Sequence, residues 1–144
     1  MFADWRQLPA LTDALQWAGW LWRGIVVWDK TNSRPQRGRF RQQTEFVVWG
    51  SNGALAVDRP VPVLPGIFRA MPPTQADRRH QTEKPLALMR ELVRICVPGG
   101  RILDPFCGSG TTLEAAVLEG YRAVGIDYSE YFAMVAKERV QGIE

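Results

Sequence analysis

The sequence predicts an α/β fold in which helices cover a mostly parallel sheet. From residue 85 onwards, segments with helical periodicity alternate with short apolar segments, in the order helix, strand, helix, strand, helix. A glycine-rich turn, residues 105–110, separates the first of these strands from the helix that follows it. Such alternation is typical of parallel sheets, because each connection between parallel strands places a helix on a face of the sheet.

The N-terminal half predicts the end of a strand, one helix and two further strands. Residues 1–5 are expected to end a strand. A helix is expected from Pro9, because apolar residues then recur with a spacing of about 3.6 and proline suits a first helical turn. We expect Gly24 to close this region. Residues 24–28 and 45–49 are rich in β-branched and aromatic side chains, which predicts two buried strands that pair antiparallel.

Five tryptophans fall within these apolar patterns. They are predicted to pack in the core or on the sheet rather than to form platforms for stacked bases. These residues are Trp17, Trp20, Trp22, Trp28 and Trp49.

The C-terminal half begins with an irregular segment and continues with regular elements. Residues 54–79 contain five prolines, which disfavours long helices and central strands there. A helix is expected from Pro85 to Cys96, ending before Pro98-Gly99-Gly100. The remaining elements are expected at residues 101–104 (strand), 111–119 (helix), 121–127 (strand) and 131–140 (helix).

Composition and length limit the classes of protein that fit. The chain has 144 residues, of which 46% are hydrophobic, and this suffices for one packed core. It contains no run of about 18 uncharged apolar residues, and its N-terminus lacks the features of a signal peptide. We therefore expect a cytoplasmic protein with no membrane partner. Cys96, Cys107 and the single His80 lack the spacing of metal ligands, so no metal site is expected.

The net charge of +3 is mild, but its distribution is uneven. Four arginines and no acidic residue lie between Thr31 and Thr44. The planar guanidinium fork suits bidentate contacts to phosphate and to guanine edges, which favours nucleic acid as a partner. A solvated loop is an equally good interpretation of this segment alone. The four residues are Arg34, Arg37, Arg39 and Arg41.

The glycine-rich turn carries the strongest functional signal. Gly108 and Gly110 remove side chains where a ligand could approach the backbone, and their amides and the helix start offer N–H groups to it. Thr111 or Thr112 is expected to cap the helix. Asp127 follows Gly108 by nineteen positions at the end of the next strand, where a carboxylate can accept both ribose hydroxyls of a nucleoside cofactor. The structural alternative is a tight turn followed by a helix-capping aspartate.

Several motifs, taken in order, resemble DNA amino-methyltransferases of the permuted β class. The most specific is Asp-Pro-Phe-Cys-Gly-Ser-Gly-Thr-Thr at 104–112, which is similar to the cofactor loop of that family. The run His-Gln-Thr-Glu-Lys-Pro at 80–85 is similar to the element that precedes this loop, and segments 2–9, 27–30 and 48–51 also resemble family segments. The resemblance implies a Rossmann-like S-adenosylmethionine-dependent methyltransferase fold. It also implies methyl transfer to the exocyclic amino group of adenine or cytosine in double-stranded DNA, as in restriction-modification systems.

The resemblance further implies where the cofactor S-adenosyl-L-methionine binds. The ribose would bind Asp127, the adenine would lie near Tyr128, and Thr82, Lys84 and Pro85 would form the opposite wall. The methionine and sulfonium part would be surrounded by residues of the glycine-rich loop, namely Asp104, Phe106, Gly108, Ser109, Gly110 and Thr111. Candidate DNA contacts are Arg37, Arg39 and Arg41.

The sequence departs from the family pattern at the catalytic loop. It contains no Asp/Ser/Asn-Pro-Pro-Tyr/Phe tetrapeptide, since Pro72-Pro73 lies between Met71 and Thr74. We therefore expect no catalytic residue within this chain, an incomplete sheet without its N-terminal strands, and no activity of this polypeptide alone. The expected organisation is a single partial domain, residues 1–144. It comprises a strand-helix-strand half with the arginine loop (1–53), a candidate target-recognition insert (54–79) and a cofactor-binding half (80–144).

Three alternatives remain open at this stage. The chain could be a non-catalytic remnant, for example of phage origin, that binds cofactor or DNA. It could also be a subunit of a split enzyme whose partner is a separate chain with the catalytic loop, or it could need a homodimer partner. A different nucleoside-dependent enzyme is a more distant alternative. The sequence identifies neither the modified base nor the recognition site.

Overall fold

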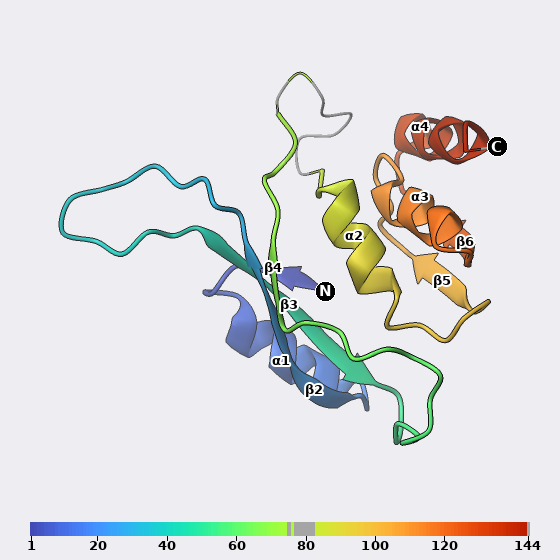
Figure 1. Cartoon of the computed structure of the whole chain (residues 1–144), viewed down its shortest axis with the longest axis horizontal. Helices are drawn as coiled ribbons and strands as arrows, with labels where there is room; N and C mark the ends of the chain where they lie inside the picture. Colours follow the sequence, from blue (N-terminus) through green and yellow to red (C-terminus); the bar gives the residue numbers. More distant parts are fainter. Residues whose placement is uncertain (75, 77–82, 144) are drawn as a thin grey trace. The chain divides into compact units, whose positions relative to one another are not determined.

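The computed structural model describes residues 1–74, 76 and 83–143 and divides the chain into two compact units. Unit 1 consists of Met1–Arg59 and Pro65–Met71, and unit 2 consists of Pro60–Leu64 and Pro72–Glu144. Each unit has its own sheet, with strand order β1-β3-β2-β4 in unit 1 and β5-β6 in unit 2 (Figure 1). The pairing is mixed, because β3 is antiparallel to both its neighbours, whereas β2 and β4, and β5 and β6, are parallel.

A long hairpin forms the centre of unit 1. Strands β2 (Leu21–Asp29) and β3 (Thr44–Ser51) pair antiparallel, as predicted, but both extend beyond the predicted bounds. Strand β1 (Phe2–Ala3) lies on the outer side of β3. The three-residue strand β4 (Ile67–Arg69) is an edge strand parallel to β2. It lies within the proline-rich segment. Because proline has no N–H group to donate to a neighbouring strand, such a segment favours an edge position.

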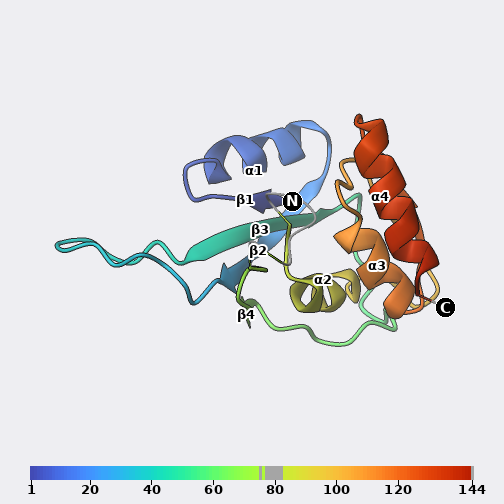
Figure 2. The same ribbon diagram turned by 90° about the horizontal axis from the view of Figure 1, so that it is seen from above.

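Helix α1 (Leu8–Trp17) packs on one face of this sheet (Figure 2). Pro9 lies in its first turn, as predicted. The close approach depends on Gly50, because a Cβ atom there would lie 2.9 Å from Leu15 Cδ2 and 2.7 Å from a backbone oxygen of the neighbouring strand. The prediction that Gly24 closes the helical region was wrong. Gly19, with φ of +81°, follows the helix, whereas Gly24 lies inside β2 at a register shift after Trp22.

Trp28 is the largest fully buried side chain of unit 1, with 2% of its surface exposed. Its indole Nε1 donates to the carbonyl of Ala70 at 2.8 Å, and the ring of Phe2 packs against it in a T-shaped arrangement with the ring centroids 6.1 Å apart. The predicted packing is therefore confirmed for Trp28, and Trp49 is half-buried.

The prediction of core packing was wrong for Trp17, Trp20 and Trp22, whose exposed fractions are 85%, 42% and 43%. Trp17 is the last residue of α1, Trp20 precedes β2, and Trp22 lies in β2 just before its register shift. The apolar pattern indicated burial, but these positions at the ends of elements leave the rings exposed.

Unit 2 follows the predicted order of elements. Its helices are α2 (Leu86–Val93), α3 (Thr111–Leu118) and α4 (Glu130–Gln141), and its strands are β5 (Arg101–Asp104) and β6 (Arg122–Gly125). The strands are parallel, with Arg101 opposite Arg122 and Asp104 opposite Gly125. Helix α3 contacts both strands and lies between α2 and α4 (Figure 1). The core of unit 2 consists of Leu88, Met89, Val93, Leu113, Ala115, Ala116 and Ala136.

Within the part of the chain that the structure describes, no helix is long and apolar enough to cross a membrane. Nor do three or more potential metal-ligating side chains gather anywhere in those same residues.

We expect Trp28→Ala to lower the free energy of unfolding by about 3–5 kcal/mol, because the change removes a large buried ring and leaves a cavity. Trp17→Ala is the matched control, because that ring is exposed; its effect should stay within about 0.5 kcal/mol. Chemical denaturation followed by circular dichroism measures both values. Equal losses for the two variants would contradict the assignment of Trp28 as the centre of this core.

Candidate functional site

The glycine-rich turn lies between β5 and α3, at the carboxyl end of the parallel strand pair. In open α/β sheets, ligands bind outside the carboxyl ends of the strands. Gly108 and Gly110 have φ angles of +50° and +83°, a backbone conformation that favours glycine. The turn therefore has the position and the backbone that the sequence predicted for it.

Asp127 closes this turn from the end of β6. Its Oδ2 accepts the amide of Gly108 at 2.8 Å, and its Oδ1 accepts the amide of Ser129 at 2.9 Å. The spacing of nineteen residues thus brings the carboxylate into direct contact with the turn. Ser129, and not Asp127, caps α4, because its hydroxyl accepts the amide of Phe132. Asp127 is therefore not the N-cap of α4.

Backbone bonds hold the turn against the same segment. The amide of Ile126 donates to the carbonyl of Asp104, and the amide of Cys107 donates back to the carbonyl of Ile126, both at 2.9 Å. These bonds extend the contact between the two strands beyond the ladder itself. The turn and the carboxylate of Asp127 consequently form one rigid edge.

Two expectations about the turn need correction. The amides of Gly108 and Gly110 were expected to face a ligand, but they donate to Asp127 Oδ2 and to the carbonyl of Cys107. The donors left for an anion are those of the first turn of α3, which have no partner within a helix. Gly110 is required by packing, because a Cβ atom there would lie 2.8 Å from the Cβ of Ala136 in α4.

The predicted threonine cap of α3 was also wrong. Helix α3 begins at Thr111, and its N-cap is Gly110 in the left-handed conformation, which threonine rarely adopts. The hydroxyl of Thr111 instead donates to Oε1 of Glu83 at 3.4 Å.

Two aromatic side chains flank this edge and are open to solvent. Phe106 is 87% exposed and Tyr128 is fully exposed. The amide of Phe106 donates to Asp104 Oδ1 at 3.1 Å, which fixes the start of the turn. Burial, followed by the charges of Asp104 and Asp127, raises the pKa of the Cys107 thiol, so this thiol stays protonated at neutral pH. A raised pKa lowers the thiolate fraction, which disfavours a nucleophilic role for Cys107.

The opposite wall that the sequence predicted is described only in part. Pro85 is buried and is the N-cap of α2, and Lys84 before it is half-buried. Thr82 lies outside the described residues, so its predicted role stays a prediction.

Sequence reasoning missed a cluster of charged residues beneath the turn. Arg139 of α4 forms ion pairs with Glu83 and Glu114 and also reaches Ser109. One signal was available, because Arg139 follows Phe132, Val135 and Ala136 at helical spacing and so falls on the apolar face of α4. A charged residue at such a position requires a buried partner.

The arginine loop connects β2 and β3 in unit 1 and extends from their ends (Figure 1). Its base is fixed by the half-buried Asp29. The carboxylate accepts Gln43 Nε2 at 3.1 Å and the amide of Thr31 at 2.9 Å, and it pairs with Nε of Arg69 in β4 at 3.3 Å. All four arginines of the loop are exposed, and none of them has an acidic partner among the residues that the structure describes.

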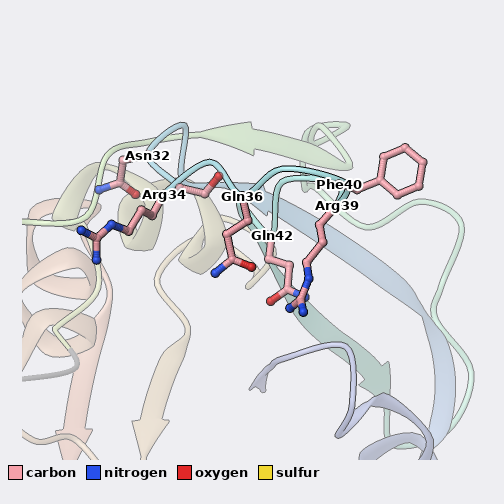
Figure 3. Close-up of a pocket in the computed structure, with 7 residues that line it drawn as sticks. Asn32, Arg34, Gln36, Arg39, Phe40 and Gln42 are labelled. Carbon is pink, nitrogen blue, oxygen red and sulfur yellow. The ribbon is translucent and has the colours of Figure 1, made fainter.

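The loop encloses a polar pocket of about 240 Å³ (Figure 3). The side chains of Gln36, Arg39 and Gln42 extend to one side of the loop, whereas Phe40 points away from them and is 99% exposed. The hydroxyl oxygen of Ser33 is buried at this pocket without a hydrogen-bond partner among the described residues. The complete lining is Asn32, Ser33, Arg34, Gln36, Arg39, Phe40 and Gln42.

A glycine turn held by an acidic residue, at the carboxyl end of parallel strands, is an arrangement typical of nucleoside-cofactor sites in Rossmann-like folds. The chain belongs to the DNA methylase family of N6 and N4 amino-methyltransferases, whose model matches residues 63–138, more than half of the chain. Members of this family are S-adenosylmethionine-dependent DNA N-methyltransferases. The resemblance identified from the motifs is thereby confirmed.

Individual relatives agree with this assignment. The chain is 28% identical to YubD of Escherichia coli (strain K12), and the match covers 99% of this chain and 61% of YubD. It is 30% identical to the type II methyltransferase M.SmaI of Serratia marcescens, over 90% of this chain and 50% of M.SmaI. The chain thus spans about half to three fifths of the length of these two relatives.

The solved structure of M1.HpyAVI in complex with S-adenosylmethionine superposes with a TM-score of 0.78. The two chains are 28% identical, and the superposition covers 96% of this chain and 72% of M1.HpyAVI. The predicted fold class is confirmed by this likeness.

We expect Gly110→Ala to destabilise the protein more than Gly120→Ala. Both residues have a φ near +80°, but a Cβ atom at Gly120 meets nothing within 4 Å, whereas one at Gly110 meets Ala136. Gly120→Ala should lower the free energy of unfolding by about 1–2 kcal/mol, because alanine is strained in this left-handed backbone conformation. Gly110→Ala should cost about 1–3 kcal/mol more because of overpacking, measured by urea unfolding. Equal costs would show that α4 does not constrain the turn.

Proposed function

We propose that this chain is the cofactor-binding part of a site-specific DNA methyltransferase that transfers a methyl group to an exocyclic amino group of adenine or cytosine. The observation that carries this proposal is the bond between the amide of Gly108 and the carboxylate of Asp127. This bond joins a glycine turn at a helix start to an acidic residue at the end of the neighbouring strand. That combination suits an adenosyl compound, as family membership also suggests.

The proposed pocket assigns one part of S-adenosylmethionine to each group of residues. Each oxygen of Asp127 accepts one backbone amide and retains further lone pairs, which can accept the two ribose hydroxyls. The exposed ring of Tyr128 is free to pack against adenine, and the first amides of α3 can bind the methionine carboxylate. Phe106 and the carboxylate of Asp104 are proposed for the methionine and sulfonium part. Lys84, Pro85 and Thr82 are proposed for the opposite wall.

When bound, the cofactor supplies a methyl group on a sulfonium leaving group. This chain's own residues would hold and orient the adenosyl and methionine parts. None of its 144 residues forms the tetrapeptide that orients the target base in the family. We therefore propose that these residues alone bind the cofactor but do not complete methyl transfer, so a purified sample would show no turnover proportional to its concentration.

Double-stranded DNA is the proposed partner of the arginine loop. Arg37, Arg39 and Arg41 are exposed, carry no acidic partner among the described residues and extend from a base that Asp29 fixes. The buried hydroxyl of Ser33, which has no hydrogen-bond partner among the described residues, adds a donor to the pocket that Arg39 lines, which suits a backbone phosphate. The proline-rich segment 54–79 is proposed to recognise the target site.

Two further hypotheses concern the catalytic tetrapeptide, which these 144 residues do not contain. In the first, the chain is a catalytically inactive remnant that binds cofactor, DNA or both. In the second, it is one subunit of a split enzyme whose other chain contributes the catalytic loop. Methylation of DNA by a mixture of this chain with a polypeptide that carries that loop would distinguish the second hypothesis from the first.

Binding of S-adenosylhomocysteine to the 144-residue chain tests the cofactor site. We expect measurable binding to the wild type by isothermal titration calorimetry. Asp127→Asn should lower the affinity by about tenfold or more, because one carboxylate oxygen is replaced by an amide nitrogen, which donates and cannot accept a hydrogen bond from a hydroxyl. Asp13→Asn, which removes the same charge from an exposed position on α1, is the control and should bind as the wild type does. A folded wild-type sample that takes up neither this compound nor S-adenosylmethionine would refute the proposed function.

The DNA assignment has a separate test. We expect Arg39→Ala to weaken duplex binding and to reduce the slope of log K against log salt by about 1, because one phosphate contact is lost. Arg122→Ala removes an exposed arginine at the amino end of β6 and should leave the slope unchanged. Fluorescence anisotropy with a labelled duplex at several salt concentrations measures both. An unchanged affinity and slope in Arg39→Ala would remove this residue from the interface.

A further inference from the structure

One arginine beneath the glycine turn connects four segments of unit 2. Nη1 of Arg139 lies 2.7 Å from Glu83 Oε1, and it also lies 3.3 Å and 3.4 Å from the carbonyl and hydroxyl oxygens of Ser109. Nε of the same guanidinium pairs with Oε2 of Glu114. Thr111 donates its hydroxyl to the Glu83 oxygen that Arg139 contacts. The cluster therefore joins α4, the turn, the start of α3 and the segment before α2.

These charges are shielded from solvent. The exposed side-chain fractions are 9% for Arg139, 5% for Glu83 and 19% for Glu114, and Ser109 is 3% exposed. Burying ions costs desolvation, so such a cluster adds little net stability compared with apolar side chains of the same shape. A planar guanidinium does fix the relative orientation of the groups it binds, because its N–H groups hold several acceptors at defined angles.

The position of the cluster indicates which segments Arg139 orients. Ala136 of α4 packs against Gly110, and Arg139, one helical turn later, donates to the carbonyl of Ser109. Helix α4 therefore contacts the turn at both Ser109 and Gly110. Glu83 immediately precedes Lys84 and Pro85, which belong to the proposed opposite wall. Arg139 thus ties the two walls of the proposed cofactor pocket to one guanidinium.

We propose that Arg139, together with Glu83 and Glu114, is a positioning cluster that sets the affinity for the cofactor by fixing the glycine turn relative to the Glu83-Lys84-Pro85 segment. None of the three residues needs to touch the cofactor for this role. The inference rests on the proposed function, because it concerns the same cofactor pocket.

The test compares two sets of ion pairs that both involve α3. The test variant is Glu83→Gln/Glu114→Gln/Arg139→Met, which removes the three charges of the cluster together while keeping side chains of similar size. The control variant is Arg90→Met/Glu119→Gln, which removes an ion pair of 2.7 Å between α2 and the residue that follows α3. A third variant, Arg139→Lys, keeps the charge but loses the planar fork.

Binding of S-adenosylhomocysteine is measured by calorimetry well below the unfolding midpoint of each sample, and the folded fraction is determined by circular dichroism. We expect the test variant to lose affinity for S-adenosylhomocysteine by about tenfold or more, by analogy with the loss that follows when residues orienting the ligands of a metal ion are changed. Arg139→Lys should lose less affinity, and the control variant should bind as the wild type does even if its midpoint falls. A purely structural cluster would lower the midpoint without changing the affinity of the folded fraction.

Each outcome separates the two proposals. A wild-type chain that binds no S-adenosylhomocysteine refutes the proposed function, and the inference falls with it. A wild type that binds, together with folded test and Arg139→Lys variants of unchanged affinity, overturns only the positioning role. If the triple variant does not fold, Arg139→Lys decides the question, because wild-type affinity in that folded variant would also overturn the role.

Discussion

The hydrogen bond from the amide of Gly108 to the carboxylate of Asp127 is the contact on which the arrangement of unit 2 depends. It joins the turn after β5 to the end of β6, and backbone bonds through Ile126 and Cys107 keep the two in register. Because Asp127 also accepts the amide of Ser129, the same carboxylate is bonded to the N-cap residue of α4. A cofactor that binds here would therefore find its acidic partner and its helix start already in place, which lowers the ordering cost of binding.

Local patterns predicted much of this geometry. The order of α2, β5, α3, β6 and α4 followed from hydrophobic periodicity, because each element is continuous in sequence and has one buried face. The contact between Gly108 and Asp127 followed from a spacing that one strand-helix-strand unit imposes. The hairpin of β2 and β3 followed from two β-branched runs.

Features that arise from contacts between distant residues were not predictable in this way. Trp17 and Trp22 fit an apolar pattern, yet both are exposed, one as the last residue of α1 and the other just before the register shift of β2. Thr111 looked like a helix cap because threonine commonly is one, but the left-handed Gly110 takes that position and the hydroxyl bonds to Glu83. The partners of Arg139 lie 25 and 56 positions away in the chain, beyond the reach of any local pattern. The three-residue β4 is too short to give a periodic signal.

The anchoring of Asp29 has a mechanical consequence for unit 1. Its carboxylate binds a side chain near β3, a backbone amide of the arginine loop and Arg69 of β4, so the foot of the loop and the middle of the proline-rich segment share one fixed point. The loop beyond that point belongs to neither a helix nor a strand and is exposed almost throughout. The loop therefore leaves the sheet at a point that three contacts of one carboxylate hold, whereas no regular secondary structure holds its tip.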